Sequence, residues 1–411
     1  MARKSFFLTL LVLSASLSAF AGGAGAQPSE KTIYTFDLTH GIYPISGLVA
    51  DSAGNLYGTT NNGGLYPDRK NPCCGAVFEL SPGSNGAWSE TVIYAFQGLS
   101  DGMSPYGTLA FDKQGNLYGT NYTYGLASQS RVFQLSQGSG GKWTDKTVYT
   151  FAGNVGQING DLTLDGEGNI YGTTQNTGSS DGTVFELSPQ ADGTWKETVL
   201  YAFPKSFPLG NPHAGVTFDA GGNLYGTTDG SSTGYGGVYE LSQSNGTWTA
   251  AVLFTFTGGN AGGEPDDKLI FDSSGNLYGV CSGNNNGVVF ELSPGSNGIW
   301  TETVLHAFPV GPGSDGAHPQ GTLVFDSRGN LYGTAPAGGL GCNGGSCGVV
   351  YELSPQSGGT WKETILHQFE SAGDGSQPQA GLYLDSAGNL FGTTKFGGTF
   401  YGYGTIFEIT P

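Results

Sequence analysis

Apolar and polar residues alternate in short runs along most of the chain, and Gly, Pro, Asn or Asp bounds each run. In one representative unit the runs cover 269–272, 277–280, 288–292 and 303–308, and they are rich in Val, Leu, Thr and aromatic residues. Runs of this length and composition predict four β-strands joined by tight turns such as 272–276. No segment after residue 26 shows a sustained helical apolar period, so we expect almost no helix.

This four-strand unit repeats along the chain. The string Gly-Asn-(Leu/Ile)-(Tyr/Phe)-Gly occurs seven times, at intervals of 53 to 61 residues. A long, regular period of short strands is typical of a β-propeller with one blade per repeat. The Asn residues of the seven strings are Asn55, Asn116, Asn169, Asn223, Asn276, Asn330 and Asn389.

The two ends of the chain indicate how the array closes. A copy of the fourth strand, 31–36, precedes the first complete unit, and the last unit ends on a third strand, 405–410. In a ring the N-terminal strand completes the last blade, which removes an exposed sheet edge at each end. We therefore predict an all-β, seven-bladed propeller over residues 27–411, with four antiparallel strands per blade and the first strand beside the central channel.

The first 26 residues have the pattern of a secretory signal peptide. Arg3 and Lys4 precede an apolar run at 6–13, and small-residue sites follow at 19–21 and 24–26. We therefore expect a secreted or periplasmic protein. No other apolar run approaches the length of a membrane span, so no membrane insertion is predicted.

The charge balance argues against a nucleic-acid partner. The chain has 15 Lys and Arg against 33 Asp and Glu, a net charge of −18, which repels phosphate backbones. Many of these carboxylates recur at fixed positions of the repeat, so turn formation explains them better than an acidic binding site does.

Most of the repeated aromatic and acidic residues have a structural interpretation. All six Trp precede a fourth strand, where packing is favoured over sugar stacking, and the seven hairpin Asp lack the alternating oxygen ligands of a calcium loop. His306 and His367 replace a Tyr of other fourth strands and are assigned to the scaffold. His40, His213 and His318 lie in fourth-to-first connections without a companion ligand, so no metal site is predicted.

Five cysteines leave at least one thiol unpaired. Cys342 and Cys347 flank a Gly-rich segment between a second and a third strand, and in an exported protein they predict a disulfide. Cys73 and Cys74 lie in the matching loop of the first unit, and Cys281 replaces a Thr. The pairing of these three stays open.

The linked segments 275–279, 287–294 and 300–305 resemble the GloVer tandem-repeat family of exported bacterial proteins. The resemblance covers essentially all of the chain after the signal, with local departures such as Gln134 for Glu and Phe391 for Tyr. It implies export and a repeat fold, but no activity and no site residues. Family members often carry a C-terminal surface anchor, which we do not expect here.

The sequence contains no nucleophile motif and no phosphate-binding loop, so it predicts no catalytic residues and no cofactor. The second-to-third and fourth-to-first connections vary most and share one face of the ring, which favours a monomeric binding module for an extracellular glycan, peptide or protein. The alternative is a propeller hydrolase or lyase, which would need acidic or histidine groups from several first strands to converge at the channel mouth. Those strands carry mostly Thr, Leu, Val and Phe, so binding is favoured over catalysis. The candidate ligand-binding residues are Tyr66, Tyr124, His213, Tyr235, His318, Tyr401 and Tyr403.

Overall fold

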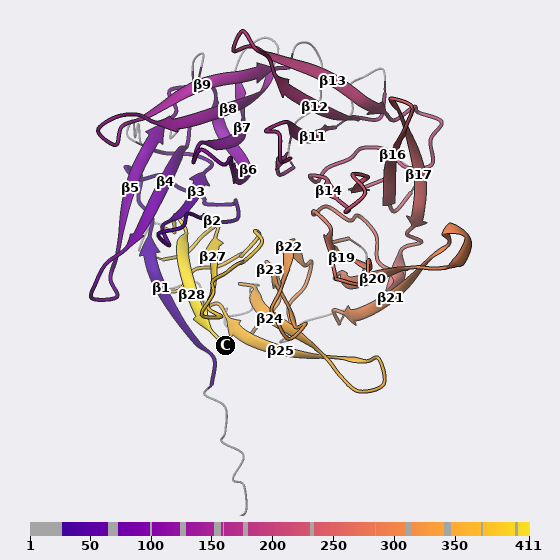
Figure 1. Cartoon of the computed structure of the whole chain (residues 1–411). Coiled ribbons are helices and arrows are strands. Elements are labelled where there is room, and N and C mark those ends of the chain that lie inside the picture. Colours follow the sequence, from indigo (N-terminus) through magenta and orange to yellow (C-terminus); the bar gives the residue numbers. More distant parts are fainter. Residues whose placement is uncertain are drawn as a thin grey trace, which may run out of the picture.

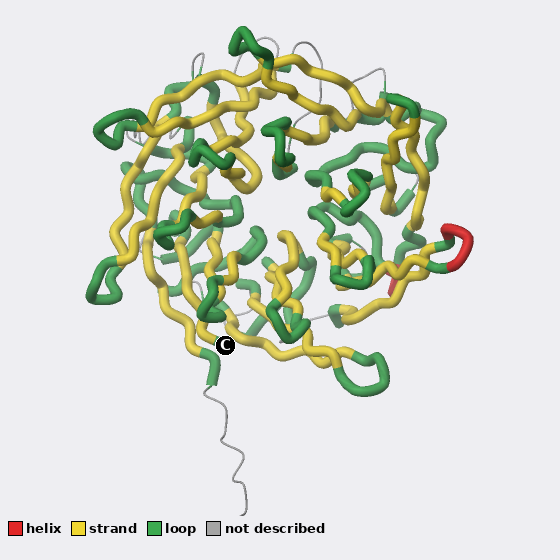
Figure 2. The backbone as a smooth tube through the Cα atoms, viewed as in Figure 1, coloured by secondary structure: helices red, strands yellow, loops and turns green. Residues whose placement is uncertain are grey.

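Seven four-stranded antiparallel sheets form a closed ring in the computed structural model (Figure 1), which confirms the predicted seven-bladed β-propeller. The structure describes residues 27–64, 73–98, 101–123, 129–151, 158, 160–175, 180–230, 234–283, 285–309, 315–340, 347–370, 373–398 and 402–411. The predicted signal peptide lies outside these ranges. Within them, helix is limited to two 3₁₀ turns, η1 (Gly259–Ala261) and η2 (Ser296–Gly298), and the remaining regular structure is strand (Figure 2).

Each blade begins with an inner strand beside the channel and ends with an outer strand at the rim (Figure 1). Blades 1 to 6 are β2–β5, β6–β9, β10–β13, β14–β17, β18–β21 and β22–β25, and blade 7 is β26–β28 with β1. The inner strands are β2 (Val49–Ala50), β6 (Met103–Phe111), β10 (Thr163–Leu164), β14 (Thr217–Phe218), β18 (Ile270–Phe271), β22 (Gln320–Phe325) and β26 (Tyr383–Leu384). The second strands are β3 (Leu56–Thr60), β7 (Leu117–Thr123), β11 (Ile170–Thr174), β15 (Leu224–Thr228), β19 (Leu277–Cys281), β23 (Leu331–Ala335) and β27 (Leu390–Thr394).

The third strands are almost completely buried on their apolar positions, and the fourth strands alternate buried and exposed residues. The third strands are β4 (Ala76–Pro82), β8 (Gln129–Gln137), β12 (Thr183–Pro189), β16 (Gly237–Ser244), β20 (Val288–Pro294), β24 (Val349–Pro355) and β28 (Thr405–Thr410). The outer strands are β5 (Trp88–Ala95), β9 (Trp143–Thr150), β13 (Trp195–Ala202), β17 (Thr247–Thr255), β21 (Trp300–Ala307), β25 (Trp361–Gln368) and β1 (Ser29–Thr35).

The N-terminal strand closes the ring as predicted. β1 pairs antiparallel with β28, from Ser29 opposite Thr410 to Thr35 opposite Thr405, and the two strands lie side by side in Figure 1. The two chain ends therefore share one sheet, which leaves no blade incomplete.

The core is a set of aromatic contacts between neighbouring blades. The Phe just after each fourth strand packs against the third-strand aromatic ring of the next blade, as Phe256 does edge-on against Phe290 at a centroid distance of 5.0 Å. The second strand has Gly279 at the same level, because a Cβ there would lie 2.7 Å from the Phe290 ring. The glycine of the repeated string thus makes room for the core ring.

The cysteines are only partly as the sequence predicted. Cys73 and Cys74 are bonded to each other, a pairing that the sequence left open. Cys281 is a buried free thiol. Cys347 is disulfide-bonded, and its predicted partner Cys342 lies outside the described residues, so their pairing stays a prediction. No helix of the described chain is long and apolar enough to cross a bilayer.

Candidate functional site

Four of the predicted ligand-binding residues lie in the described part of the chain, and these four do not form one cluster. Among them, only His213 lines the pocket at the ring axis. His318 is exposed and its ring donates a 2.7 Å hydrogen bond to the Ser282 carbonyl, and Tyr235 is 43% exposed on a loop. Tyr403 packs against the aromatic core between blades 7 and 1. Tyr66, Tyr124 and Tyr401 lie outside the described residues.

The pocket at the ring axis is lined by residues just before the inner strand in five blades, by residues within β6 and β22 in the other two, and by Lys395 after β27. It has a volume of about 330 Å³ and takes lining residues from all seven blades. In most blades these positions hold small or uncharged residues, such as Ser46-Gly47 in blade 1 and Gly321-Thr322 in blade 6. We call this space the axial pocket.

Blade 5 departs from this pattern because it brings three charged residues in sequence to the axial pocket: Asp266, Asp267 and Lys268. Blade 3 adds Asp161, and blade 4 adds His213. Blade 7 adds Lys395, so the axial pocket holds acidic, basic and imidazole groups that come from four different blades.

Two of these carboxylates also connect neighbouring blades. Asp267 accepts a 2.8 Å hydrogen bond from the Gly321 N–H of blade 6, and Asp161 accepts a 2.6 Å hydrogen bond from the Thr108 N–H of blade 2. Each uses one carboxylate oxygen in these bonds, so part of its role is structural. The second oxygen of each carboxylate remains a possible contact for a ligand.

Lys268 and Asp266 make contacts that hold them in defined positions. Lys268 Nζ donates a 2.9 Å hydrogen bond to Thr163 Oγ1, so the lysine of blade 5 reaches blade 3 past blade 4. Asp266 accepts a 2.8 Å hydrogen bond from the Ser282 hydroxyl. The charged groups of the axial pocket are therefore positioned before any ligand binds, which lowers the entropic cost of binding.

The electrostatics of the axial pocket favour the neutral forms of Asp266, Asp267 and Lys268. Burial and the nearby Asp266 charge raise the pKa of Asp267 to about 8. Burial also raises the pKa of Asp266, although Ser282 and His213 oppose it, and burial lowers the pKa of Lys268 against the pull of Asp161. Shifts in these directions are common at functional sites, where desolvation and close charges are concentrated.

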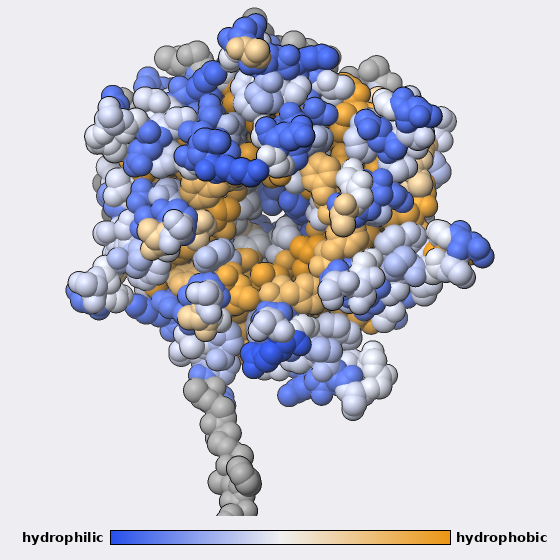
Figure 3. Space-filling view, viewed as in Figure 1, coloured by the Kyte–Doolittle hydropathy of each residue, from blue (hydrophilic) through white to orange (hydrophobic). Residues whose placement is uncertain are grey.

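The channel continues to the opposite face as an apolar opening of about 430 Å³. Phe218, Phe271 and Val324 line this half, and Asp161 and Lys268 line both halves, so the charged pair marks the boundary between them. Figure 3 shows a hollow at the ring axis with mostly hydrophobic residues around it and hydrophilic residues at the periphery. The channel is therefore polar toward one face and apolar toward the other.

The sequence prediction missed the acidic and lysine residues of the axial pocket. It searched the inner strands themselves, whereas Asp161, Asp266, Asp267 and Lys268 precede them. A signal was available: when the units are aligned on the Asp of the first hairpin, the charged run of blade 5 stands where the others have mostly small or uncharged residues. Acidic and histidine groups therefore do meet at the channel, although they come from the segments before the inner strands.

Metal-ligand geometry occurs elsewhere in the described chain. The ligand atoms of His306, Asp315 and Glu363 lie within 4.8 Å of one another at the outer rim, away from the residues of the axial pocket. The sequence assigned His306 to the scaffold and predicted no metal site.

One solved structure supports the fold, and two others are similar at a lower level. A protein from Lactobacillus plantarum is similar with a TM-score of 0.52 and 16% identity, over 77% of this chain and 84% of that one. The Penicillium chrysogenum α-L-arabinanase complexed with arabinobiose has a TM-score of 0.49 and 15% identity, over 79% and 97% of the two chains. The Fusarium graminearum α-L-arabinofuranosidase Arb93A has a TM-score of 0.48 and 13% identity, over 82% and 97%.

No curated protein matches the chain. The sequence does match the Gloeobacter/Verrucomicrobia repeat twice, over residues 24–233 and 212–411, and the two matches together span all the described blades. The chain therefore belongs to the Gloeobacter/Verrucomicrobia repeat family.

Proposed function

We propose that this protein is an exported glycan-binding propeller that holds one sugar unit in the axial pocket. The observation that carries the proposal is the charged run of blade 5, Asp266 to Lys268, which faces the axial pocket where most other blades present small or uncharged residues. Export is supported by the signal pattern of residues 1–26.

The composition of the axial pocket suits a neutral, polyhydroxylated ligand. Burial favours the neutral forms of Asp266, Asp267 and Lys268, so neither a strong anion nor a strong cation matches the axial pocket. Neutral carboxyl and amine groups both donate and accept hydrogen bonds, and adjacent sugar hydroxyls do the same. The volume of about 330 Å³ is at the small end of ligand sites, which fits one sugar unit better than a folded peptide segment.

A glycan array followed by calorimetry tests the proposal. For any glycan that binds the full chain, we expect D266N and K268A to weaken the affinity at least about tenfold, because each removes a positioned contact in the axial pocket. D192N is a matched control, since Asp192 is a fully exposed surface carboxylate. If no glycan binds, or if both pocket variants bind like the parent, the proposal is wrong.

A propeller hydrolase is the second candidate, and the raised pKa of Asp267, about 8, favours it. A carboxyl group that stays protonated at neutral pH can act as a general acid on a glycosidic oxygen, and Asp161 supplies a second carboxyl group in the same pocket. We would incubate each bound glycan with the parent and with D267N, and measure new reducing ends. Release by the parent that D267N abolishes, with binding retained, would support hydrolysis, whereas bound glycans that stay intact would leave binding as the function.

A further inference from the structure

Two interfaces between neighbouring blades share one contact at the outer rim. A Tyr two positions before the fourth-strand Phe of one blade faces a Glu of the next outer strand: Tyr149 Oη lies 2.7 Å from Glu197 Oε2, and Tyr34 Oη lies 3.3 Å from Glu90 Oε2. In each pair the Tyr hydroxyl donates to the carboxylate. This contact joins the outer strands of adjacent blades and belongs to the scaffold.

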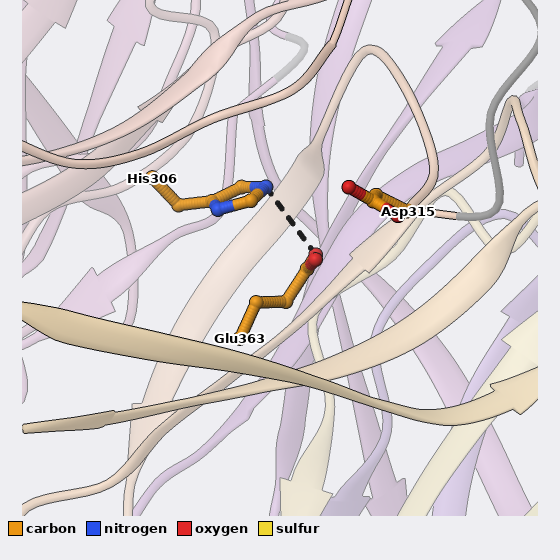
Figure 4. A group of neighbouring side chains, drawn as sticks. All are labelled: His306, Asp315 and Glu363. Carbon is orange, nitrogen blue, oxygen red and sulfur yellow. Dashed lines mark ion pairs between the residues drawn. The ribbon is translucent and has the colours of Figure 1, made fainter.

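Between blades 5 and 6 the Tyr of this contact is replaced by His306, which faces Glu363 of β25. The connection between β21 and β22 brings Asp315 to the same point, as Figure 4 shows. One ligand atom from each residue lies within 4.8 Å of the other two, and His306 Nε2 lies 3.4 Å from Glu363 Oε1. Three potential ligands therefore converge from three separate chain segments.

The contact between His306 and Glu363 does not satisfy either residue. His306 Nε2 and Glu363 Oε1 are both buried, and neither has a hydrogen-bond partner among the described residues. The two side chains are 18% and 11% exposed, so an ion can reach them although water is largely excluded. Burial lowers the pKa of His306 although the nearby Asp315 charge opposes this shift, and burial together with the Asp315 charge raises the pKa of Glu363 to about 8.

We propose that His306, Asp315 and Glu363 bind one Zn²⁺ ion at the outer rim between blades 5 and 6. In a tetrahedral zinc site with bonds of about 2.1 Å, the ligand atoms lie roughly 3.4 Å apart, and the 3.4 Å between His306 and Glu363 fits that spacing. One imidazole nitrogen and two carboxylates favour zinc over Ca²⁺, which takes six to eight oxygen ligands. The ion would connect two outer strands and an interblade connection, and water would complete its coordination.

The neighbouring interface provides a natural comparison, because it has the same residue types in a different arrangement. Between blades 6 and 7, His367 takes the Tyr position and Asp374 matches Asp315. There His367 Nε2 contacts Asp374 Oδ2 directly at 2.9 Å, so the histidine already has a partner. We therefore expect the zinc ion at His306 and not at His367.

Zinc titration of the full chain after removal of metals by a chelator tests this assignment. We expect one equivalent of Zn²⁺ by calorimetry and by elemental analysis for the parent, and at least about 100-fold weaker binding for H306Y. H306Y introduces the residue that the repeat uses at Tyr34 and Tyr149, so it should keep the fold by donating to Glu363. H367Y is the matched control and should bind zinc like the parent.

A second variant keeps the test decisive if H306Y alters the fold, which circular dichroism would detect. E363Q preserves the shape of the side chain and removes its negative charge, and it should weaken Zn²⁺ binding without affecting the fold. The proposal is overturned if the parent binds no zinc, or if H306Y or E363Q binds it as tightly as the parent. Equal titrations with Ca²⁺ and Mg²⁺ should give no binding, and binding of either ion at the affinity of zinc would contradict the metal assigned.

Discussion

Two sets of aspartates in this propeller illustrate how position decides the role of one residue type. The hairpin Asp of each unit, such as Asp272, accepts hydrogen bonds from Ser274 N–H, from the backbone and side chain of Asn276, and from the Tyr278 hydroxyl. Burial raises the pKa of Asp272, but the hydrogen bonds from these donors outweigh burial and lower the pKa overall.

For Asp267 in the axial pocket, burial outweighs hydrogen bonding and the net pKa shift is upward. Asp267 has one hydrogen bond from the Gly321 N–H, and burial with the nearby Asp266 raises its pKa to about 8. The hairpin Asp occurs in all seven units, whereas the pocket carboxylates of blade 5 occur once. A repeated, fully bonded carboxylate serves the fold, and a single-copy, poorly satisfied one indicates a site.

The largest effect should come from removing a whole repeated element. Deletion of residues 27–38 removes β1 and exposes the edge of β28. The apolar burial of Ile33, Tyr34 and Phe36 is lost with it, so we expect the free energy of unfolding to fall by on the order of 5 kcal/mol. Urea denaturation measures this loss, and a deletion variant as stable as the parent would mean that ring closure contributes little.

Removal of a single hairpin carboxylate should lower the free energy of unfolding by less than the deletion does, but by a measurable amount. D272A removes the acceptor of four hydrogen bonds in a partly buried turn, and we expect a loss of about 2–3 kcal/mol in the free energy of unfolding. The matched comparison is D267N, which keeps an acceptor for Gly321 and replaces a carboxyl group that is mostly protonated at neutral pH, so it should cost little stability. If D272A and D267N lowered the free energy of unfolding equally, the hairpin and axial-pocket aspartates would not differ in their structural role.

The scaffold aspartates and the ring could be predicted from the sequence because their signals are local and repeated. Asp272 and Asn276 lie within one turn, and the orphan strand at 31–36 has a matching gap at the other end of the chain. The prediction placed β1 beside β28 for this reason, and it is confirmed.

The axial pocket could not be assembled in the same way. Asp161 and Lys268 are far apart in the chain. They line the same pocket only because the ring brings the segments before the inner strands of blades 3 and 5 to one axis. The residues vary from blade to blade, so no repeated motif marks them. The sequence analysis selected the loop tyrosines as ligand-binding candidates because variable loops rich in aromatic residues often take part in recognition.

The pH dependence of stability should differ between the two sets. The pKa of Asp267 is about 8 in the folded protein and 3.8 as its ordinary value, so the folded state binds the proton more tightly. Its contribution to stability is present below about pH 4 and is lost as the pH rises through about 8, at a rate of at most about 1.4 kcal/mol per pH unit. Urea midpoints from pH 5 to 8 should therefore fall less for D267N than for the parent, and parallel profiles would show that Asp267 is ionised throughout.

The smallest effect should come from Tyr235, which the sequence placed among the ligand-binding residues. Tyr235 is 43% exposed. Its carbonyl accepts a hydrogen bond from the Glu264 N–H, and this bond survives truncation of the side chain. We expect Y235A to change the free energy of unfolding by no more than about 0.5 kcal/mol. Because Tyr235 does not line the axial pocket, the variant should also bind any glycan ligand with the affinity of the parent, while D266N does not. If Y235A lost binding and D266N kept it, recognition would belong to the loop face that the sequence predicted, and the carboxylates at the axis would serve only to join the blades.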